Sequence, residues 1–389
     1  MRVTVHLRRH SSHRPDQLPT WIRRDAVTKI LGPPAPEALA ELRDHRGARV
    51  GLGLFSPDSD IPVRVICRGD RELPEDWLSR RVHQALEARE QLGLEGTTGY
   101  REINAEGDGL PGLTVDRYGT HRVIQITTAS MLARREEIAA ALRDHTPRPT
   151  IWTVPEAAAR RESIPALCEG DPTDVLSFRE YGLDLETTPP PSQKTGAYHD
   201  QRENRRRVAS LAAAGGGRVL DLGCHLGGFS LHAARAGLSC VAVDRSDEAL
   251  SLVRRNADAN GLEDIETVRS DIFGHMDEPA LSGPFGAIIF DPPKVAASGH
   301  QAGRATKAMG LALRRLIPRL SPGGLLVVCS CSYNVGPDAV RSLVARVSVE
   351  LGVRLPRLEH RGPGPDHPTC PHHVEGNYLS VTIFRRADG

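Results

Sequence analysis

VLDLGCHLGGFS at residues 219–230 is the stretch that decides the fold. A short apolar run ends near Asp221, and Gly223, Gly227 and Gly228 follow before a segment with helical character. A strand that passes through a glycine turn into a helix predicts the first strand–helix unit of an α/β sheet. Ligands bind such sheets at the carboxyl ends of the strands, near the point where strand order reverses. The glycines therefore indicate a ligand-binding loop.

The alternation of strands and helices continues to residue 330. Further strands are expected at 239–244, 265–271, 286–291 and 324–330, with helices at 228–236, 246–260 and 303–320. Repetition at this spacing predicts a parallel, Rossmann-like sheet with helices on both faces.

Three aspartates end successive strands and predict how a nucleoside cofactor would bind. Asp221 ends the first of these strands. Asp244 ends the second, where its carboxylate can accept hydrogen bonds from ribose hydroxyls. Asp271 ends the third and is expected near an adenine amino group. Backbone N–H groups at the helix start can bind a carboxylate. A nicotinamide dinucleotide uses similar elements, but the G-x-x-x-G-G spacing departs from the dinucleotide pattern. The pattern favours S-adenosylmethionine.

FDPPK at 290–294 predicts a loop that grips a base. Each proline fixes φ and removes an N–H, so the Asp291 carboxylate and the backbone carbonyls are held toward the cleft. An extruded base can be held by such polar groups, for which Pro292, Pro293 and Lys294 are candidates. Methyltransferases of exocyclic amines usually carry an aromatic residue where this chain has Lys294, so a purine amine is disfavoured as the target.

VVCSCS at 327–332 predicts a nucleophile. Carbon 5 of a pyrimidine takes a methyl group only after a thiolate has added to carbon 6. Cys331 lies at the carboxyl end of its strand, and Ser330 beside it is a candidate base contact, whereas Cys329 would lie deeper. Most buried strand cysteines are only packing. The glycine loop and FDPPK favour catalysis for Cys331 alone. The base that removes the carbon-5 proton is left open, with Asp291 and an ordered water as candidates.

Residues 1–185 have a different character. Short alternating segments up to residue 70 predict strands, interrupted by a proline-marked turn and a short helix at 31–43. A helix is expected from about 75 to Gly93, and a proline-rich linker at 181–193. We therefore expect a β-rich domain at 1–74, a small α+β domain at 75–185 and the methyltransferase domain at 186–389.

Composition is that of a globular protein, with 39% hydrophobic and 25% charged residues. No apolar run approaches the length of a membrane span, and the N-terminus does not resemble a secretory signal. The seven scattered cysteines lack zinc spacing, so reduced thiols and no metal are expected. The net charge is only +1, but basic residues cluster at 2–49 and 202–207 and could contact phosphates.

QKTGAYHDQRENRR from residue 192 onward completes a resemblance that covers nearly the whole chain. With the motifs above, it resembles the bacterial 23S rRNA cytosine-C5 methyltransferases that carry an N-terminal PUA-like domain. LPTWIRR (18–24) and LFSPDSDIPVRVI (54–66) are similar to the PUA-like part, EGDGLPGLTVDRYG (106–119) to the central domain, and DHPTCPHHVEGNYL (366–379) to the closing segment. The family's glycine loop commonly carries aromatic and threonine residues where this chain has residues 223–226.

The resemblance implies roles for individual residues. Cys331 becomes the nucleophile and Asp291 the acid that contacts the base. The residues expected to contact or frame S-adenosylmethionine are Lys194, Thr195, Gly196, Asp200, Arg202, Asp221, Gly223, Asp244, Asp271 and Asp291. The resemblance also implies a cytoplasmic enzyme that acts on 23S rRNA or a large-subunit precursor, and it allows a homodimer.

Two alternatives remain open at the level of sequence. The enzyme could methylate another base or another RNA. The altered glycine loop would also suit a non-catalytic assembly factor that binds rRNA on a methyltransferase scaffold.

Overall fold

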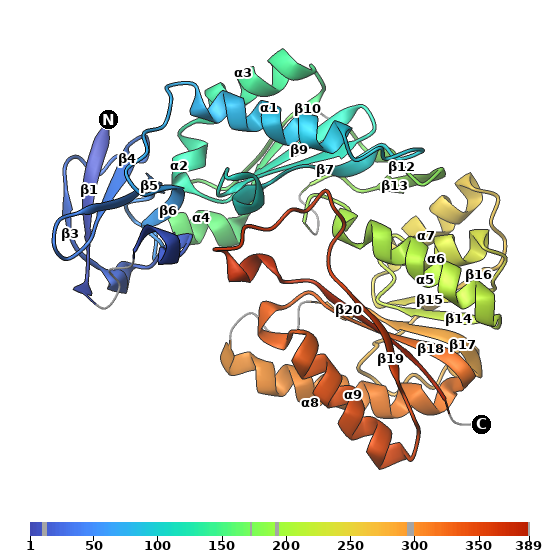
Figure 1. The fold of residues 1–389 in the computed structure, drawn as a ribbon. Coiled ribbons are helices and arrows are strands. Elements are labelled where there is room, and N and C mark those ends of the chain that lie inside the picture. Colours follow the sequence, from blue (N-terminus) through green and yellow to red (C-terminus); the bar gives the residue numbers. More distant parts are fainter. Residues whose placement is uncertain (10–13, 172, 191–193, 294–298, 388–389) are drawn as a thin grey trace. The chain divides into compact units, whose positions relative to one another are not determined.

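The computed structural model describes residues 1–9, 14–171, 173–190, 194–293 and 299–387. The chain forms two compact units (Figure 1). Unit 1 comprises Met1–Leu176, Thr188–Gly196 and Pro365–Gly376, and unit 2 comprises Ser177–Thr187, Ala197–Gly364 and Asn377–Gly389.

A six-stranded sheet opens unit 1, with strand order β2-β6-β5-β4-β1-β3. Its strands are β1 (Arg2–Leu7), β2 (Trp21–Ile22), β3 (Val27–Leu31), β4 (Leu39–Arg43), β5 (Arg49–Phe55) and β6 (Val63–Arg68). The short helix predicted within 31–43 is wrong, because residues 39–43 form β4, which pairs with β1 and β5. Ala40 and Leu42 are buried by that pairing, which outweighs the helical preference of an Ala-Glu-Leu-Arg sequence.

The rest of unit 1 is built on a five-stranded sheet covered by helices. The strands are β7 (Gly99–Asn104), β8 (Leu113–Tyr118), β9 (His121–Ile126), β10 (Thr150–Val154) and β11 (Leu167–Gly170), and the helices are α1 (Trp77–Glu90), α2 (Ala129–Leu132), α3 (Arg135–His145) and α4 (Glu156–Glu162). The predicted helix is confirmed as α1, and its apolar face packs on this sheet. Leu54 and Ile66 of the first sheet belong to the same core.

A late segment of the chain returns to unit 1. Asn104 Nδ2 donates a hydrogen bond to the Pro368 carbonyl oxygen at 2.9 Å, and Thr20 Oγ1 donates to the His372 carbonyl oxygen at 3.0 Å. Residues 365–376 are therefore bonded to both sheets of this unit.

Unit 2 contains the predicted parallel sheet, in the order β16-β15-β14-β17-β18-β20-β19. Its strands are β14 (Val219–Leu222), β15 (Cys240–Asp244), β16 (Ile265–Arg269), β17 (Phe285–Phe290), β18 (Leu320–Ser330), β19 (Arg357–Arg361) and β20 (Ser380–Arg385), and the hairpin β12 (Leu176–Glu180) and β13 (Leu183–Thr187) precedes it. Neighbouring strands from β16 to β18 are parallel, and β20 is antiparallel to β18.

Helices cover both faces of this sheet, as the sequence predicts (Figure 1). The helices are α5 (Arg202–Gly215), α6 (Gly228–Arg235), α7 (Asp247–Ala259), α8 (Gly299–Leu316) and α9 (Pro337–Leu351). One core joins α8 and α9 to Leu220 and Leu222, and another joins α5 and α6 to Val219. Strand order reverses at β14, since β15 and β16 lie on one side and β17 and β18 on the other. The carboxyl ends of β14 and β17 are therefore where a ligand is expected.

Candidate active site

The glycine loop begins where β14 ends, as the sequence predicts. Gly223 has φ of 85°, and a Cβ there would lie 2.2 Å from the carbonyl oxygen of Asp291. Gly227 has φ of 88° and precedes the first turn of α6. Both positions therefore require glycine, because another side chain would be strained or would collide with the end of β17.

Asp221 is fully buried behind this loop. Its Oδ2 accepts hydrogen bonds from the Ser230 backbone N–H at 3.1 Å and the Ser230 hydroxyl at 2.7 Å. Among the residues that the structure describes, its Oδ1 has no hydrogen-bond partner. Burial raises the pKa of Asp221 to about 6, although the bonds from Ser230 oppose the shift. A buried carboxylate with one oxygen that lacks a hydrogen-bond partner is suited to bind a polar or positively charged ligand group.

Asp244 ends β15 and fixes the turn that faces β14. Its Oδ2 accepts the backbone N–H of His225 at 3.2 Å, and its Oδ1 accepts that of Ser246 at 3.0 Å. His225 has φ of 50° inside the glycine loop. Asp244 is therefore a structural support of the loop as well as the predicted acceptor for ribose hydroxyls.

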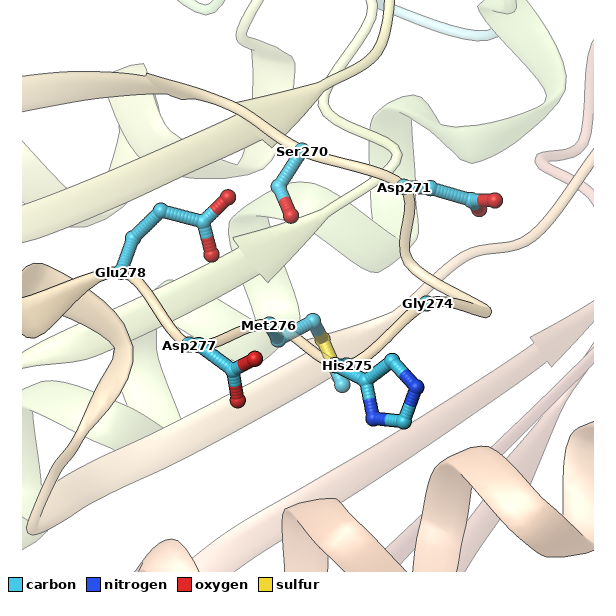
Figure 2. Close-up of a pocket in the computed structure, with 7 residues that line it drawn as sticks. All are labelled: Ser270, Asp271, Gly274, His275, Met276, Asp277 and Glu278. Carbon is cyan, nitrogen blue, oxygen red and sulfur yellow. The ribbon is translucent and has the colours of Figure 1, made fainter.

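Asp271 lies two residues beyond β16 and is exposed. Its Oδ1 accepts the backbone N–H of Phe273 at 2.9 Å. Figure 2 shows Asp271 on the loop that follows β16. Residues of this loop line a hollow of about 490 Å³. The residues lining this hollow are Ser270, Asp271, Gly274, His275, Met276, Asp277 and Glu278.

Asp291 follows β17, and hydrogen bonds from side-chain amides orient its carboxylate. Gln201 Nε2 donates to Asp291 Oδ2 at 3.3 Å, and Gln201 Oε1 accepts from Asn204 Nδ2 at 2.8 Å. The Asp291 backbone N–H donates to the Leu222 carbonyl oxygen at 3.0 Å. Pro292 and Pro293 follow, and Lys294 lies outside the described residues. Gln201 was missed as a site residue, although it lies within the DQR motif.

The two cysteines of VVCSCS differ as the sequence predicts. Cys329 is 0% exposed inside β18, and burial, with the Asp291 charge as a further cause, raises the pKa of its thiol well above the ordinary range. Cys331 follows the last residue of β18 and is partly exposed. The register pairs Phe290 with Val328, so Asp291 and Cys331 leave neighbouring strands at the same edge of the sheet.

Ser330, between the two cysteines, is also buried. Within the described part of the chain, its hydroxyl oxygen has no hydrogen-bond partner. The Ser330 hydroxyl is therefore able to make a hydrogen bond to a ligand next to Cys331.

The predicted cofactor residues of QKTG and DQR lie on different units. Lys194, Thr195 and Gly196 belong to unit 1, where Thr195 Oγ1 donates to Asp116 Oδ2 at 2.6 Å. The DQR residues belong to unit 2. Tyr378 donates its hydroxyl to Asp200 Oδ2 at 2.6 Å, and the Arg202 side chain is buried with Nε donating to Glu203 at 3.2 Å.

The basic run 202–207 is divided between core and surface. Arg202 and Arg205 are buried and do not form a phosphate-contacting surface, whereas Arg206 is exposed, so phosphate contact by the exposed part of the run stays a prediction. Arg205 is 5% exposed and donates through Nη1 to Glu180 Oε2 at 2.7 Å. Arg207 pairs with Glu359. An arginine on a helix can be buried when an acidic residue from a distant segment pairs with it. The sequence does not show which acidic residues will be such partners.

Glu180 is the centre of a buried cluster that sequence reasoning missed. It accepts hydrogen bonds from Arg205 and from His232 Nε2, the latter at 3.0 Å. Burial alone would raise the pKa of Glu180, but the charges of Arg205 and His232 hold it well below its usual range. The cluster ties the β12–β13 hairpin to α5 and α6, next to the glycine loop.

These features together fit S-adenosylmethionine. The buried Asp221 Oδ1 has bonding capacity left, Gly223 and Gly227 allow close approach, and α6 presents its first turn to the same edge. Among the residues that the structure describes, no group of three or more His, Cys, Asp or Glu side chains could hold a metal ion. In the same residues, no helix has both the length and the apolar character that a bilayer crossing requires.

Comparisons with known proteins show the class of this enzyme. A family model for S-adenosylmethionine-dependent methyltransferases matches residues 149–371, and one for PUA-like domains matches residues 5–68. The crystal structure of SMU.776, assigned as a methyltransferase and complexed with SAH, shares the fold with a TM-score of 0.82 at 18% identity, covering 99% of this chain and 100% of that chain. The protein is therefore an S-adenosylmethionine-dependent methyltransferase with an N-terminal PUA-like domain.

Relatives of similar length define its family more closely. "Ribosomal RNA large subunit methyltransferase I" of Pseudoalteromonas atlantica is 32% identical over 401 residues, which cover 99% of both chains. The protein of the same name from Aeromonas hydrophila is 34% identical over 384 residues, which cover 94% of both. The chain belongs to this family.

Proposed function

We propose that this enzyme methylates large-subunit rRNA and forms 5-methylcytosine in 23S rRNA, on the free RNA or on a precursor of the subunit. The observation that carries the proposal is the partly exposed Cys331 at the carboxyl end of β18, beside Asp291 at the end of β17. The names of the relatives support rRNA as the substrate. The choice of carbon 5 of cytosine rests on the thiol.

The proposed reaction proceeds through a covalent adduct. The Cys331 thiolate forms a bond to carbon 6 of the cytosine, which makes carbon 5 nucleophilic. S-adenosylmethionine supplies a methyl group bonded to a positively charged sulfur. Once carbon 5 carries the methyl group, a base removes the carbon-5 proton, the double bond between carbons 5 and 6 re-forms, and the bond to the Cys331 sulfur breaks. Asp291, or a water molecule that it orders, is proposed as that base.

Other residues are assigned to binding. The residues proposed to hold the base are Pro292, Pro293, Lys294 and Ser330, and those proposed to hold the cofactor are Lys194, Thr195, Gly196, Asp200, Arg202, Asp221, Gly223, Asp244, Asp271 and Asp291. The buried Asp221 carboxylate, the turn at Asp244 and the hollow at Asp271 support the last part of that list. The domain boundaries at 74 and 185, the cytoplasmic location and the homodimer stay predictions.

The test traps the adduct. RNA carrying 5-fluorocytidine cannot lose a proton from carbon 5 after methyl transfer, so wild-type protein should remain bonded to it in the presence of S-adenosylmethionine. Cys331→Ala should bind the cofactor and form neither adduct nor product. Cys329→Ala is the matched control, because Cys329 is buried and its thiol pKa is raised. It should retain adduct formation.

Two results would overturn the proposal. Full activity of Cys331→Ala would remove the covalent route, and mass analysis of digested rRNA that finds the new methyl group on another base would replace the substrate. Binding of rRNA without any turnover would favour a non-catalytic assembly factor instead.

A further inference from the structure

Tyr198, two residues before Asp200 of the DQR motif, has its backbone anchored to the buried Glu180 cluster. Arg205 Nη2 donates to the Tyr198 carbonyl oxygen at 2.8 Å, while Arg205 Nη1 is bonded to Glu180. The same guanidinium lies against Gly228, where a Cβ would be 2.4 Å from Arg205 Nε. Three elements, β12, α5 and α6, therefore hold this segment in place.

The Tyr198 ring contacts the glycine loop. Its centroid lies 5.0 Å from that of His225, and the two rings are nearly perpendicular, at 87°. The His225 backbone N–H is itself bonded to Asp244. The Tyr198 ring therefore contacts the part of the glycine loop that Asp244, the predicted ribose acceptor, holds by a hydrogen bond.

Acidic groups lie within electrostatic reach of the Tyr198 phenol. Burial raises its pKa, and so do the charges of Asp291, Cys331, Asp200 and Asp244. The phenol therefore stays neutral at physiological pH. Asp244 belongs to the nucleoside end of the proposed cofactor site, and Asp291 and Cys331 belong to the reacting end. The Tyr198 phenol is within electrostatic reach of both ends, and its ring contacts His225, whose backbone is bonded to Asp244.

The group of S-adenosylmethionine that belongs between these ends is its sulfonium. A cation is attracted to the face of an aromatic ring, and nearby carboxylates add to that attraction. We propose that the Tyr198 ring contacts the sulfonium of S-adenosylmethionine and selects the charged cofactor over its neutral product, S-adenosylhomocysteine. The inference rests on the proposed position of the cofactor between Asp244 and Asp291, and it does not depend on which base is methylated.

The test compares the two ligands, which differ by one methyl group and one positive charge. Dissociation constants for S-adenosylmethionine and S-adenosylhomocysteine are measured by calorimetry, without RNA, on wild type, Tyr198→Phe and Tyr198→Leu. Tyr198→Leu should weaken S-adenosylmethionine about tenfold relative to S-adenosylhomocysteine. Tyr198→Phe keeps the ring and should leave the ratio unchanged. Tyr333→Leu is the matched control, since Tyr333 is 49% exposed and belongs to the same unit.

A second variant keeps the test valid if Tyr198→Leu does not fold. Pentafluorophenylalanine at position 198 has nearly the shape of the phenylalanine in Tyr198→Phe, but its ring face no longer has a negative electrostatic potential. It should therefore weaken the binding of S-adenosylmethionine and leave that of S-adenosylhomocysteine unchanged. Equal losses for both ligands, or no loss, would overturn the proposal. Failure of wild type to bind either ligand would overturn the cofactor position on which it rests, whereas a wrong target base would leave these ratios intact.

Discussion

Replacing Asp221 by asparagine should make unit 2 more stable in the absence of cofactor. The Asp221 side chain is 0% exposed, and burial raises its pKa from 3.8 to about 6. The folded protein therefore binds this proton more tightly than the unfolded chain, so stability is lost as pH rises from about 4 to about 6. A shift of about two pH units corresponds to about 3 kcal/mol above that range.

Asparagine removes this penalty because it is neutral and similar in shape, and its carbonyl oxygen can still accept both bonds from Ser230. We expect the pH-dependent part of the gain from Asp221→Asn in the free energy of unfolding of unit 2 to be about 3 kcal/mol at pH 8 and about half of that at pH 5. The buried Nδ2 that replaces Oδ1 has no acceptor among the described residues and offsets about 1–3 kcal/mol of the gain at both pH values. The gain should be accompanied by weaker S-adenosylmethionine binding, since an N–H then occupies the place of a carboxylate oxygen.

The chain offers separate probes for its two units. Cys240 is buried in unit 2, so its labelling by a thiol reagent at increasing urea, followed by mass spectrometry, reports the opening of that unit. The tryptophans, Trp21, Trp77 and Trp152, all belong to unit 1, and their fluorescence serves as the control that should not change. A destabilised Asp221→Asn at pH 8, or a gain that is the same at pH 5 and pH 8, would refute the argument.

Three further outcomes are expected. Glu180→Gln should destabilise unit 2 by about 3–5 kcal/mol, because it leaves the Arg205 guanidinium buried without its counter-charge; Cys240 labelling measures this, and an unchanged urea dependence would contradict it. Gly223→Ala should weaken S-adenosylmethionine at least tenfold in calorimetry, since its Cβ would collide with the Asp291 carbonyl; unaltered affinity would show that the loop adapts. Arg9→Ala should reduce the slope of log affinity for rRNA against log salt by about 0.7–0.9, and an equal slope would place Arg9 outside the interface.

The methyltransferase sheet was predictable because its signals are local. Each strand is a short apolar run, and glycine or aspartate follows it at the position where the chain turns toward the ligand. The positive φ of Gly223 and the bonding of Asp244 follow from those residue types at those positions. Local chemistry also separated Cys331 from Cys329, since one residue lies inside β18 and the other just beyond it.

The sequence was least informative where distant residues decide the outcome. Residues 39–43 have helical preference, yet pairing with β1 and β5 makes them a strand. The run RENRRR has the composition of a phosphate-binding surface, yet Glu180 and Glu359, from other segments, neutralise Arg205 and Arg207. Neither partner is marked in the sequence, because an ion pair depends on how the segments pack.

Sequence alone determined the order of elements, the edge of the sheet that carries the chemistry and the residue types available there, because turn geometry and hydrophobic periodicity are properties of a few neighbouring residues. Only the tertiary structure decided which of those residues have bonding capacity left. It gave Asp221 a raised pKa, oriented Asp291 through Gln201 and anchored Tyr198 through Arg205. Burial and hydrogen-bond partners arise when segments far apart in the chain come together, and no single segment contains that information.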